Sequence, residues 1–449
     1  MQAILINNAT IVNEGETLKG HILSANGRIE KIFRGASPDF EENSSLRIID
    51  ATGKILIPGI IDDQVHFREP GLTHKADIYS ESKAAIAGGI TSYMEMPNTI
   101  PPTTNKQFLA EKVNIARQSS FANYSFFLGA TNDNLRDLME ADPATVCGIK
   151  VFMGSSTGNM LVDNDAVLRS IFSIIKIPIA VHCEDEAIIK ANTLAHKRKY
   201  GEKIPVMMHP AIRSEEACYR SSSYAVELAR EFGTRLHVLH ISTARELELF
   251  DSVTPVEKKK ITSEACIHHL WFDQSDYAKY GTKIKWNPAI KTHKDKEALI
   301  KAVNDGLIDI IATDHAPHTN QEKELSYLNA PSGGPMVQHS LVAIMEMVRN
   351  KQISMEKLVE KMCHTPATIF NINERGYIRE GYYADLVLID PDSSWTVNKD
   401  NILYKCGWAP MEGRTFNSKV THTIVNGHIV YENGIFDEHP RSKQLTFKR

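Results

Sequence analysis

IIDDQVHF (residues 60–67) starts with aliphatic residues of the kind found in buried strands and ends beside a histidine. Seven more short apolar, β-branched runs follow it along the chain, and amphipathic stretches with helical spacing lie between them. The later runs are 91–96, 124–128, 147–152, 177–181, 236–241, 260–265 and 308–312, and the amphipathic stretches include 76–87, 105–116, 163–174, 214–231 and 294–303. Eight strands alternating with helices predict an α/β fold, a parallel (β/α)8 TIM-like barrel over residues 58–376.

The two ends of the chain have a different pattern. Residues 1–57 and 377–449 contain short alternating runs broken by Gly and Asn, among them DLVLI (385–389) and IVNGH (424–428). Neither end has enough apolar residues for a core of its own, so we expect both to form one composite β-sandwich domain beside the barrel.

Composition narrows the class of protein. The 449 residues carry a formal net charge of -4, which disfavours a nucleic-acid binder that neutralises phosphates. The sequence has no run of about 18 apolar residues, so no membrane span is predicted. Six widely spaced cysteines without a C-x-x-C pair indicate reduced packing residues. We therefore expect a cytoplasmic protein that acts on a small molecule. The stretch 318–335 predicts a long loop on the catalytic face, a lid or a binding loop.

Polar residues gather at the end of the first run. With a period of two, Asp62, Gln64, His66 and Arg68 share one face of the strand, which would point into the barrel mouth. Burying these groups is costly unless a ligand or metal satisfies them. A surface strand with a solvated polar face is the alternative, and the apolar neighbours favour burial.

Lys150 lies inside the apolar run GIKVFM (148–153), where an unpaired ammonium is disfavoured. Two solutions remain open. The amine can have a lowered pKa and react with carbon dioxide to form a carbamate, or it can make a plain ion pair.

Two further strand ends carry histidines. His182 and His240, together with His66 and Asp314, make a nitrogen and oxygen ligand set suited to zinc or a similar divalent ion. His237 is one strand position out of step and is assigned to the core or to a place behind the ligands.

Seven motifs spread over nearly the whole chain resemble the amidohydrolase superfamily and, within it, the dihydroorotases found as separate bacterial enzymes. They are DQVHFREPG (63–71), MPNT (96–99), GIKVFM (148–153), AVHCED (180–185), HVLHIST (237–243), NPAIK (287–291) and ATDHAPH (312–318). The resemblance implies hydrolysis of (S)-dihydroorotate to N-carbamoyl-L-aspartate, reversibly, in de novo pyrimidine biosynthesis. It also implies a homodimer.

The resemblance further implies a binuclear zinc site. One ion would be held by His66 and Asp314 and the other by His182 and His240, with a carboxylated Lys150 between them. A hydroxide bridging the metals would attack the amide, and Asp314 would shuttle the proton. This chain has Gln64 where the family has a further histidine, and an amide is a poorer zinc ligand, so two zinc ions per chain, or one, are expected.

The substrate residues are assigned by the same resemblance. Arg68 and Asn98 would bind the carboxylate of dihydroorotate, with help from His318, and Asn287 would contact the ring. Backbone groups of Gly333, Gly334 and Pro335 would do likewise. The segment NPAIK ends in Lys291, where the family has Arg.

Two alternatives stay open. A hydantoinase, dihydropyrimidinase or allantoinase would share the metal motifs, but their rings lack the carboxylate that Arg68 is expected to bind. A non-catalytic dihydroorotase-like partner subunit would explain Gln64, but loss of function usually erodes several site residues, and here the other ligands remain.

Overall fold

The barrel is present in the computed structural model, which describes residues 3–35, 43, 45–154 and 160–449. Its strands are β6 (Ile60–Val65), β7 (Ile90–Glu95), β8 (Asn123–Phe126), β9 (Leu128–Gly129), β10 (Ile149–Phe152), β11 (Ile179–His182), β12 (Leu236–Val238), β13 (Ile261–Cys266) and β14 (Ile310–Ala312). Neighbours pair in parallel in two ladders, β6-β7-β8 and β9 to β14. A parallel bridge between Val65 and His315 closes the ring. The predicted fold class is confirmed, and the third predicted strand is divided into β8 and β9.

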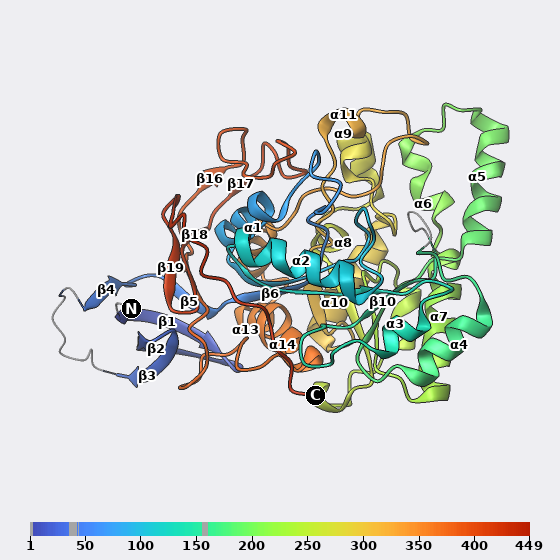
Figure 1. Ribbon diagram of the computed structural model, residues 1–449. Helices are drawn as coiled ribbons and strands as arrows, with labels where there is room; N and C mark the ends of the chain where they lie inside the picture. The colour runs from blue at the N-terminus through green and yellow to red at the C-terminus, as the bar shows by residue number, and fades with distance from the viewer. Residues whose placement is uncertain (1–2, 36–42, 44, 155–159) are drawn as a thin grey trace.

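Helices surround these strands (Figure 1). The longer ones are α1 (Ile78–Ala87), α2 (Lys106–Ser119), α4 (Asp165–Ile174), α5 (Glu186–Tyr200), α7 (Glu215–Phe232), α10 (His293–Asp305) and α12 (Ser340–Arg349). The shorter ones are α3 (Leu135–Met139), α6 (His209–Ile212), α8 (Ile267–Trp271), α9 (Tyr277–Tyr280), α11 (Asn320–Lys323), α13 (Met355–Val359) and α14 (Thr365–Phe370). Several start at a side-chain cap, such as Asp77 before α1 and Ser214 before α7, which satisfies a free N–H of the first turn. The predicted loop 318–335 contains α11.

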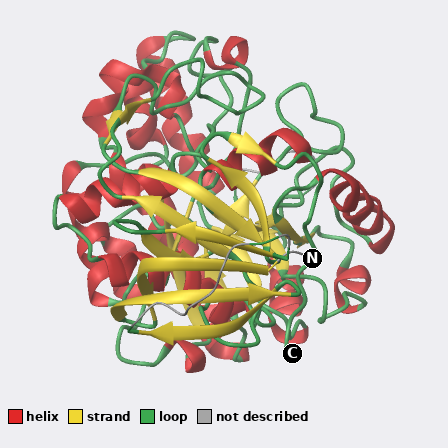
Figure 2. Cartoon of the chain, turned by 90° about the vertical axis from the view of Figure 1, so that its left-hand side faces the viewer, coloured by secondary structure: helices red, strands yellow, loops and turns green. Residues whose placement is uncertain are grey.

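Strands from both chain ends form one nine-stranded sheet, which Figure 2 shows in front of the helices. Its strands are β1 (Ala3–Asn13), β2 (Glu16–Ala25), β3 (Arg28–Arg34), β4 (Leu46–Asp50), β5 (Ile55–Pro58), β15 (Leu386–Asp390), β18 (Lys419–Val425), β19 (His428–Glu432) and β20 (Ile435–Phe436). The ends join where β5 pairs with β15, and a separate small ladder joins β16 (Trp395–Thr396) to β17 (Thr415–Phe416). Residues 1–2, 36–42 and 44 of the predicted terminal domain, and 155–159 of the predicted barrel, lie outside the described residues. The boundaries at 57/58 and 376/377 stay predictions.

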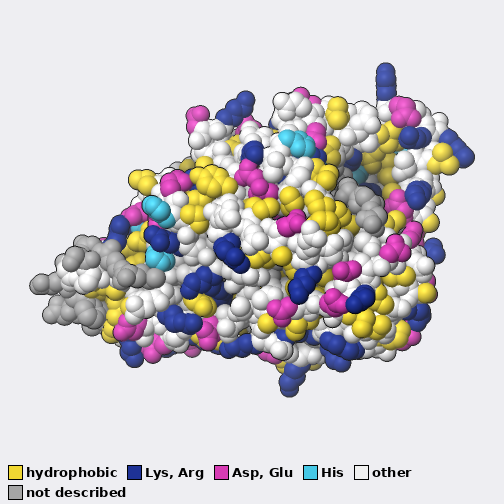
Figure 3. All heavy atoms as spheres, in the orientation of Figure 1, with side chains coloured by type: hydrophobic (Ala, Val, Ile, Leu, Met, Phe, Trp, Pro, Cys, Tyr) yellow, Lys and Arg dark blue, Asp and Glu magenta, His cyan; other side chains and the backbone are white. Residues whose placement is uncertain are grey.

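The surface and the cysteines agree with the composition. Acidic and basic side chains are interspersed on the face drawn in Figure 3. Among the described helices, none is long and apolar enough to cross a membrane. All six cysteines are free, and five are buried. The cytoplasmic location and the homodimer stay predictions.

Candidate functional site

The candidate site is a cavity of about 340 Å³ at the carboxyl ends of the barrel strands. Nearly all residues predicted from the sequence line it, although they come from eight separate segments of the chain. They are Gln64, His66, Arg68, Asn98, Lys150, His182, His240, Asn287, Asp314, His318 and Gly333. Gly334 and Pro335 follow Gly333 and are not among its lining residues.

The predicted metal ligands form two close pairs. His66 Nε2 lies 3.2 Å from Asp314 Oδ1, and His182 Nδ1 lies 3.0 Å from His240 Nε2. Burial lowers the pKa of all three histidines, so their rings are neutral and offer lone pairs. The His240 Nδ1 atom is buried without a hydrogen-bond partner. Neutral imidazoles beside a carboxylate fit a divalent metal ion.

The positive charge of Lys150 acts on both pairs. It contributes to the lowered pKa of His66, His182 and His240, and it partly offsets the rise in the pKa of Asp314 that burial causes. Its side chain is buried, makes no ion pair with any residue that the structure describes, and lies over the Phe152 ring at 4.7 Å. Burial lowers the pKa of Lys150 to about 8. Such an amine is neutral often enough near physiological pH to react with carbon dioxide, which fits the carbamate interpretation better than the ion pair.

Three residues of the site have strained backbone conformations. Arg68, His240 and Asp314 have positive φ angles of 68°, 42° and 45°, which L-residues rarely adopt. All three side chains point into one cavity. The surrounding barrel therefore holds these residues in costly conformations at the place where their side chains meet.

The Gln64 side chain makes a hydrogen bond to Asp314. Its Nε2 donates to Asp314 Oδ1 at 3.2 Å, and its oxygen accepts from the Cys266 thiol at 3.6 Å. In this arrangement the amide oxygen is turned away from Asp314, and Gln64 supports the carboxylate. Burial raises the pKa of Asp314 to about 7.

Asn98 has a contact that the sequence did not reveal. Its Oδ1 lies 2.7 Å from His66 Nδ1 and accepts that ring proton, which leaves Nε2 unprotonated toward Asp314. The Asn98 amide nitrogen remains for a ligand in the cavity.

Basic side chains surround His318 at the edge of the cavity, and one of them, Lys75, pairs with Glu322 at 2.8 Å. Arg68 is 6% exposed, donates from Nε to the Pro317 carbonyl at 3.0 Å and meets His318 Nε2 at 3.0 Å. Lys75 Nζ lies 3.0 Å from His318 Nδ1, and burial together with Arg68 and Lys75 lowers the pKa of His318 well below its usual value. Arg68 makes no direct ion pair with a carboxylate among the described residues, although Asp314, Glu95 and Glu322 stabilise its charge electrostatically.

Two residues of the site were missed in the sequence analysis. Glu184 lies fully buried, with Oε2 3.1 Å from His182 Nε2 and 3.1 Å from Arg213 Nη1. Arg213 Nε in turn donates to Asn287 Oδ1 at 2.7 Å. Glu184 stands in the motif AVHCED, two residues after a ligand, and this was the only local signal for it.

Comparison with known proteins agrees with this geometry. The model of the Amidohydrolase family matches residues 55–430. The chain belongs to the amidohydrolase family. Curated relatives named dihydroorotase include those of Methanosphaera stadtmanae (33% identity over 92% of this chain and 93% of the relative) and Carboxydothermus hydrogenoformans (33%, 95% and 96%). Among solved structures, an L-hydantoinase (dihydropyrimidinase) from Arthrobacter aurescens is 28% identical, with a TM-score of 0.93 over 99% of this chain and 100% of that chain. The names of both groups of relatives support a cyclic amidohydrolase.

Proposed function

We propose that this amidohydrolase is a dihydroorotase that reversibly hydrolyses (S)-dihydroorotate to N-carbamoyl-L-aspartate in de novo pyrimidine biosynthesis. The observation that carries the proposal is Arg68, a buried guanidinium at the cavity wall with no carboxylate partner in the described part of the chain. Its planar fork fits a carboxylate, and dihydroorotate brings one beside its cyclic amide. The names of the curated relatives support the same reaction.

The ligand residues suit two zinc ions, with His66 and Asp314 at one position and His182 and His240 at the other, joined by carboxylated Lys150. Zinc bound there would lower the pKa of water and polarise the amide carbonyl. Asn98 holds His66 in the tautomer that presents Nε2. One ion alone remains an option in this proposal, because Gln64 donates to Asp314 and replaces an imidazole.

Asp314 is the proposed proton carrier. Its carboxylate would take the proton of the attacking water and return it to the amide nitrogen when the ring opens. Asp314 lines the cavity with Oδ1 3.2 Å from His66 Nε2, which supports a role beside the proposed metal position.

Substrate binding is assigned to the polar residues that line the cavity beside the proposed metal ligands. Arg68 would pair with the carboxylate, aided by the Asn98 amide nitrogen and His318. Asn287, held by Arg213, would contact the ring together with the backbone at Gly333, Gly334 and Pro335. These contacts would place the scissile amide against the ligand residues.

A hydantoinase-type activity is the second candidate, favoured by the likeness to the L-hydantoinase along 99% of the chain. The lack of a direct carboxylate contact for Arg68 among the described residues argues against it, because a hydantoin ring carries no carboxylate. A non-catalytic subunit is disfavoured because the four ligand residues and Lys150 line one cavity.

The test combines metal content, measured by plasma mass spectrometry, with an ultraviolet assay on the same sample using dihydroorotate, dihydrouracil and a 5-substituted hydantoin. We expect one or two zinc ions in the ligand cavity and turnover of dihydroorotate above both other rings. The Lys150→Ala variant should lose the zinc of this cavity and the activity together. Preference for a ring without a carboxylate would refute the substrate assignment. Absence of turnover of all three rings by zinc-loaded protein would refute the proposal that the protein is an enzyme of this kind.

A further inference from the structure

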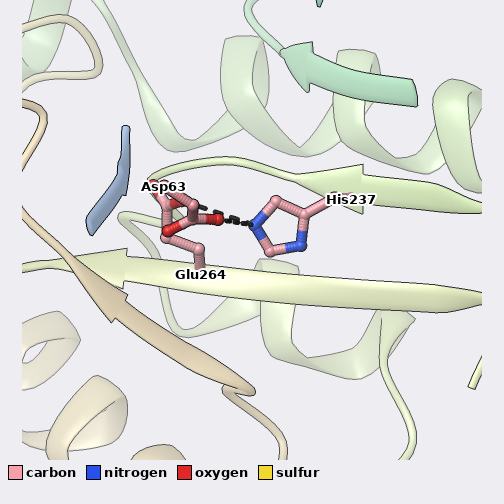
Figure 4. Close-up of side chains that lie close together, drawn as sticks. All are labelled: Asp63, His237 and Glu264. Atoms are coloured by element: carbon pink, nitrogen blue, oxygen red, sulfur yellow. Dashed lines mark hydrogen bonds and ion pairs between the residues drawn. The ribbon is translucent and has the colours of Figure 1, made fainter. Parts of the chain in front are cut away.

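A second group of buried ligand-type residues lies inside the barrel, outside the cavity described above. Asp63 on β6, His237 on β12 and Glu264 on β13 point toward one another (Figure 4). His237 Nε2 is 3.2 Å from Asp63 Oδ2 and 3.3 Å from Glu264 Oε2. None of the three side chains is more than 1% exposed.

The hydrogen bonds around the group leave these atoms short of donors. Thr262 Oγ1 donates to the Leu236 carbonyl at 3.2 Å, so at 2.9 Å from His237 Nδ1 it accepts the ring proton. That bond directs Nε2 toward the two carboxylates, in the way that the distant nitrogen of a ligating histidine is usually held. Among the described residues, Asp63 has no other hydrogen-bond donor within reach of its oxygens, although the carboxylate is fully buried.

Charge leads to the same conclusion. Without a metal, neutrality of the group requires both an imidazolium at His237 and a proton on one carboxylate, whereas a divalent cation with neutral His237 balances the two carboxylates directly. For metal–ligand bonds of about 2.0 Å, neighbouring ligand atoms of a tetrahedral site are about 3.3 Å apart. The separations of 3.2 and 3.3 Å match this spacing.

One member of the group borders a cavity. His237 and Thr262 line a cavity of about 630 Å³ at the amino-terminal ends of β11, β12 and β13, on the far side of the barrel from the candidate active site.

We propose that Asp63, His237 and Glu264 form a structural zinc site that links β6, β12 and β13. It is independent of the proposed function. Glu264 also accepts through Oε1 from the backbone N–H of His240 at 3.0 Å, so an ion here would brace the segment that carries His240.

The direct test is anomalous diffraction from crystals of the full chain grown with zinc chloride, recorded on both sides of the zinc absorption edge. A peak between the three side chains is expected, separate from any peak at His66 or His182. Density for zinc at the candidate active site with none at Asp63 would overturn the proposal, and this measurement needs no variant.

Metal counting in solution gives a second test. After dialysis against zinc-free buffer, Asp63→Asn should hold one zinc ion fewer per chain than the natural protein. Asp309→Asn is the matched control, because Asp309 is also a buried carboxylate but pairs with Lys259, and it should lose none. Equal zinc in Asp63→Asn and the natural protein would refute the site.

Discussion

Replacing Arg68 by Gln tests the substrate assignment most directly. Hydrogen bonds to charged groups contribute about 1.5 to 3 kcal/mol each. The guanidinium of Arg68 would make two such bonds to the substrate carboxylate, whereas the Gln amide would keep part of one of them. We expect a loss of about 2 to 4 kcal/mol in transition-state stabilisation, which is about a 30- to 900-fold fall in kcat/KM for dihydroorotate. Most of it should be a raised KM, because the carboxylate lies away from the scissile amide and is bound alike in ground and transition states.

The same substitution should not destabilise the protein. Burial lowers the pKa of Arg68 from 12.5 to about 10, so the charged form is disfavoured in the folded state. At pH 7 the arginine is charged both folded and unfolded, and this desolvation is a cost to folding. Removing the charge should raise the free energy of unfolding by about 1 to 3 kcal/mol, after allowing for the lost bond to the Pro317 carbonyl. Urea denaturation measures this effect and separates lost binding from lost folding.

The assay is steady-state hydrolysis of dihydroorotate followed by ultraviolet absorbance, with dihydrouracil as the substrate without a carboxylate. Arg68→Lys is the control, since it keeps the charge without the planar fork and should fall between the natural protein and Arg68→Gln. An unchanged kcat/KM for dihydroorotate, or an equal loss with dihydrouracil, would refute the pairing of Arg68 with the carboxylate.

Three further predictions concern the metal residues and the core. Burial lowers the pKa of Lys150 to about 8, so the neutral amine that reacts with carbon dioxide becomes more abundant as the pH rises to that value. Metal-stripped protein, given fixed concentrations of dissolved carbon dioxide and zinc, should therefore recover activity faster as the pH rises to about 8, with no further increase above it. A recovery rate independent of pH would contradict carbamate formation. Gln64→His should slow the loss of zinc to a chelator if residue 64 occupies a ligand position, and an unchanged rate would mean that Gln64 acts only through Asp314. Lys112→Met should lower the free energy of unfolding, measured in urea, by about 3 to 5 kcal/mol, because it leaves the fully buried Glu95 unpaired. The double variant Lys112→Met with Glu95→Gln should recover most of this loss. If it does not, the loss comes from packing and not from charge.

Much of the site followed from the sequence because parallel barrels bring the carboxyl ends of their strands together. The periodicity located the barrel strands, and the polar residue after each apolar run then had to face the same mouth. Thus His66, Lys150, His182, His240 and Asp314 could be grouped although they are spread over 249 positions. Four of the five predicted helices begin one or two residues before the observed ones, since the predicted start includes the capping residue, which is not helical; the fifth, 294–303, begins one residue after the observed start.

The sequence by itself determined the strand and helix periods, the barrel and the types of residue at its mouth, because these depend on local alternation of apolar and polar side chains. Only the tertiary structure decided which atoms meet. The bond from Gln64 to Asp314, the bond from Arg213 to Asn287 and the group around Asp63 each join distant strands or loops. That Arg68 has no direct carboxylate partner among the described residues is likewise visible only in three dimensions, because desolvation and pairing depend on distances across the barrel that no local pattern encodes.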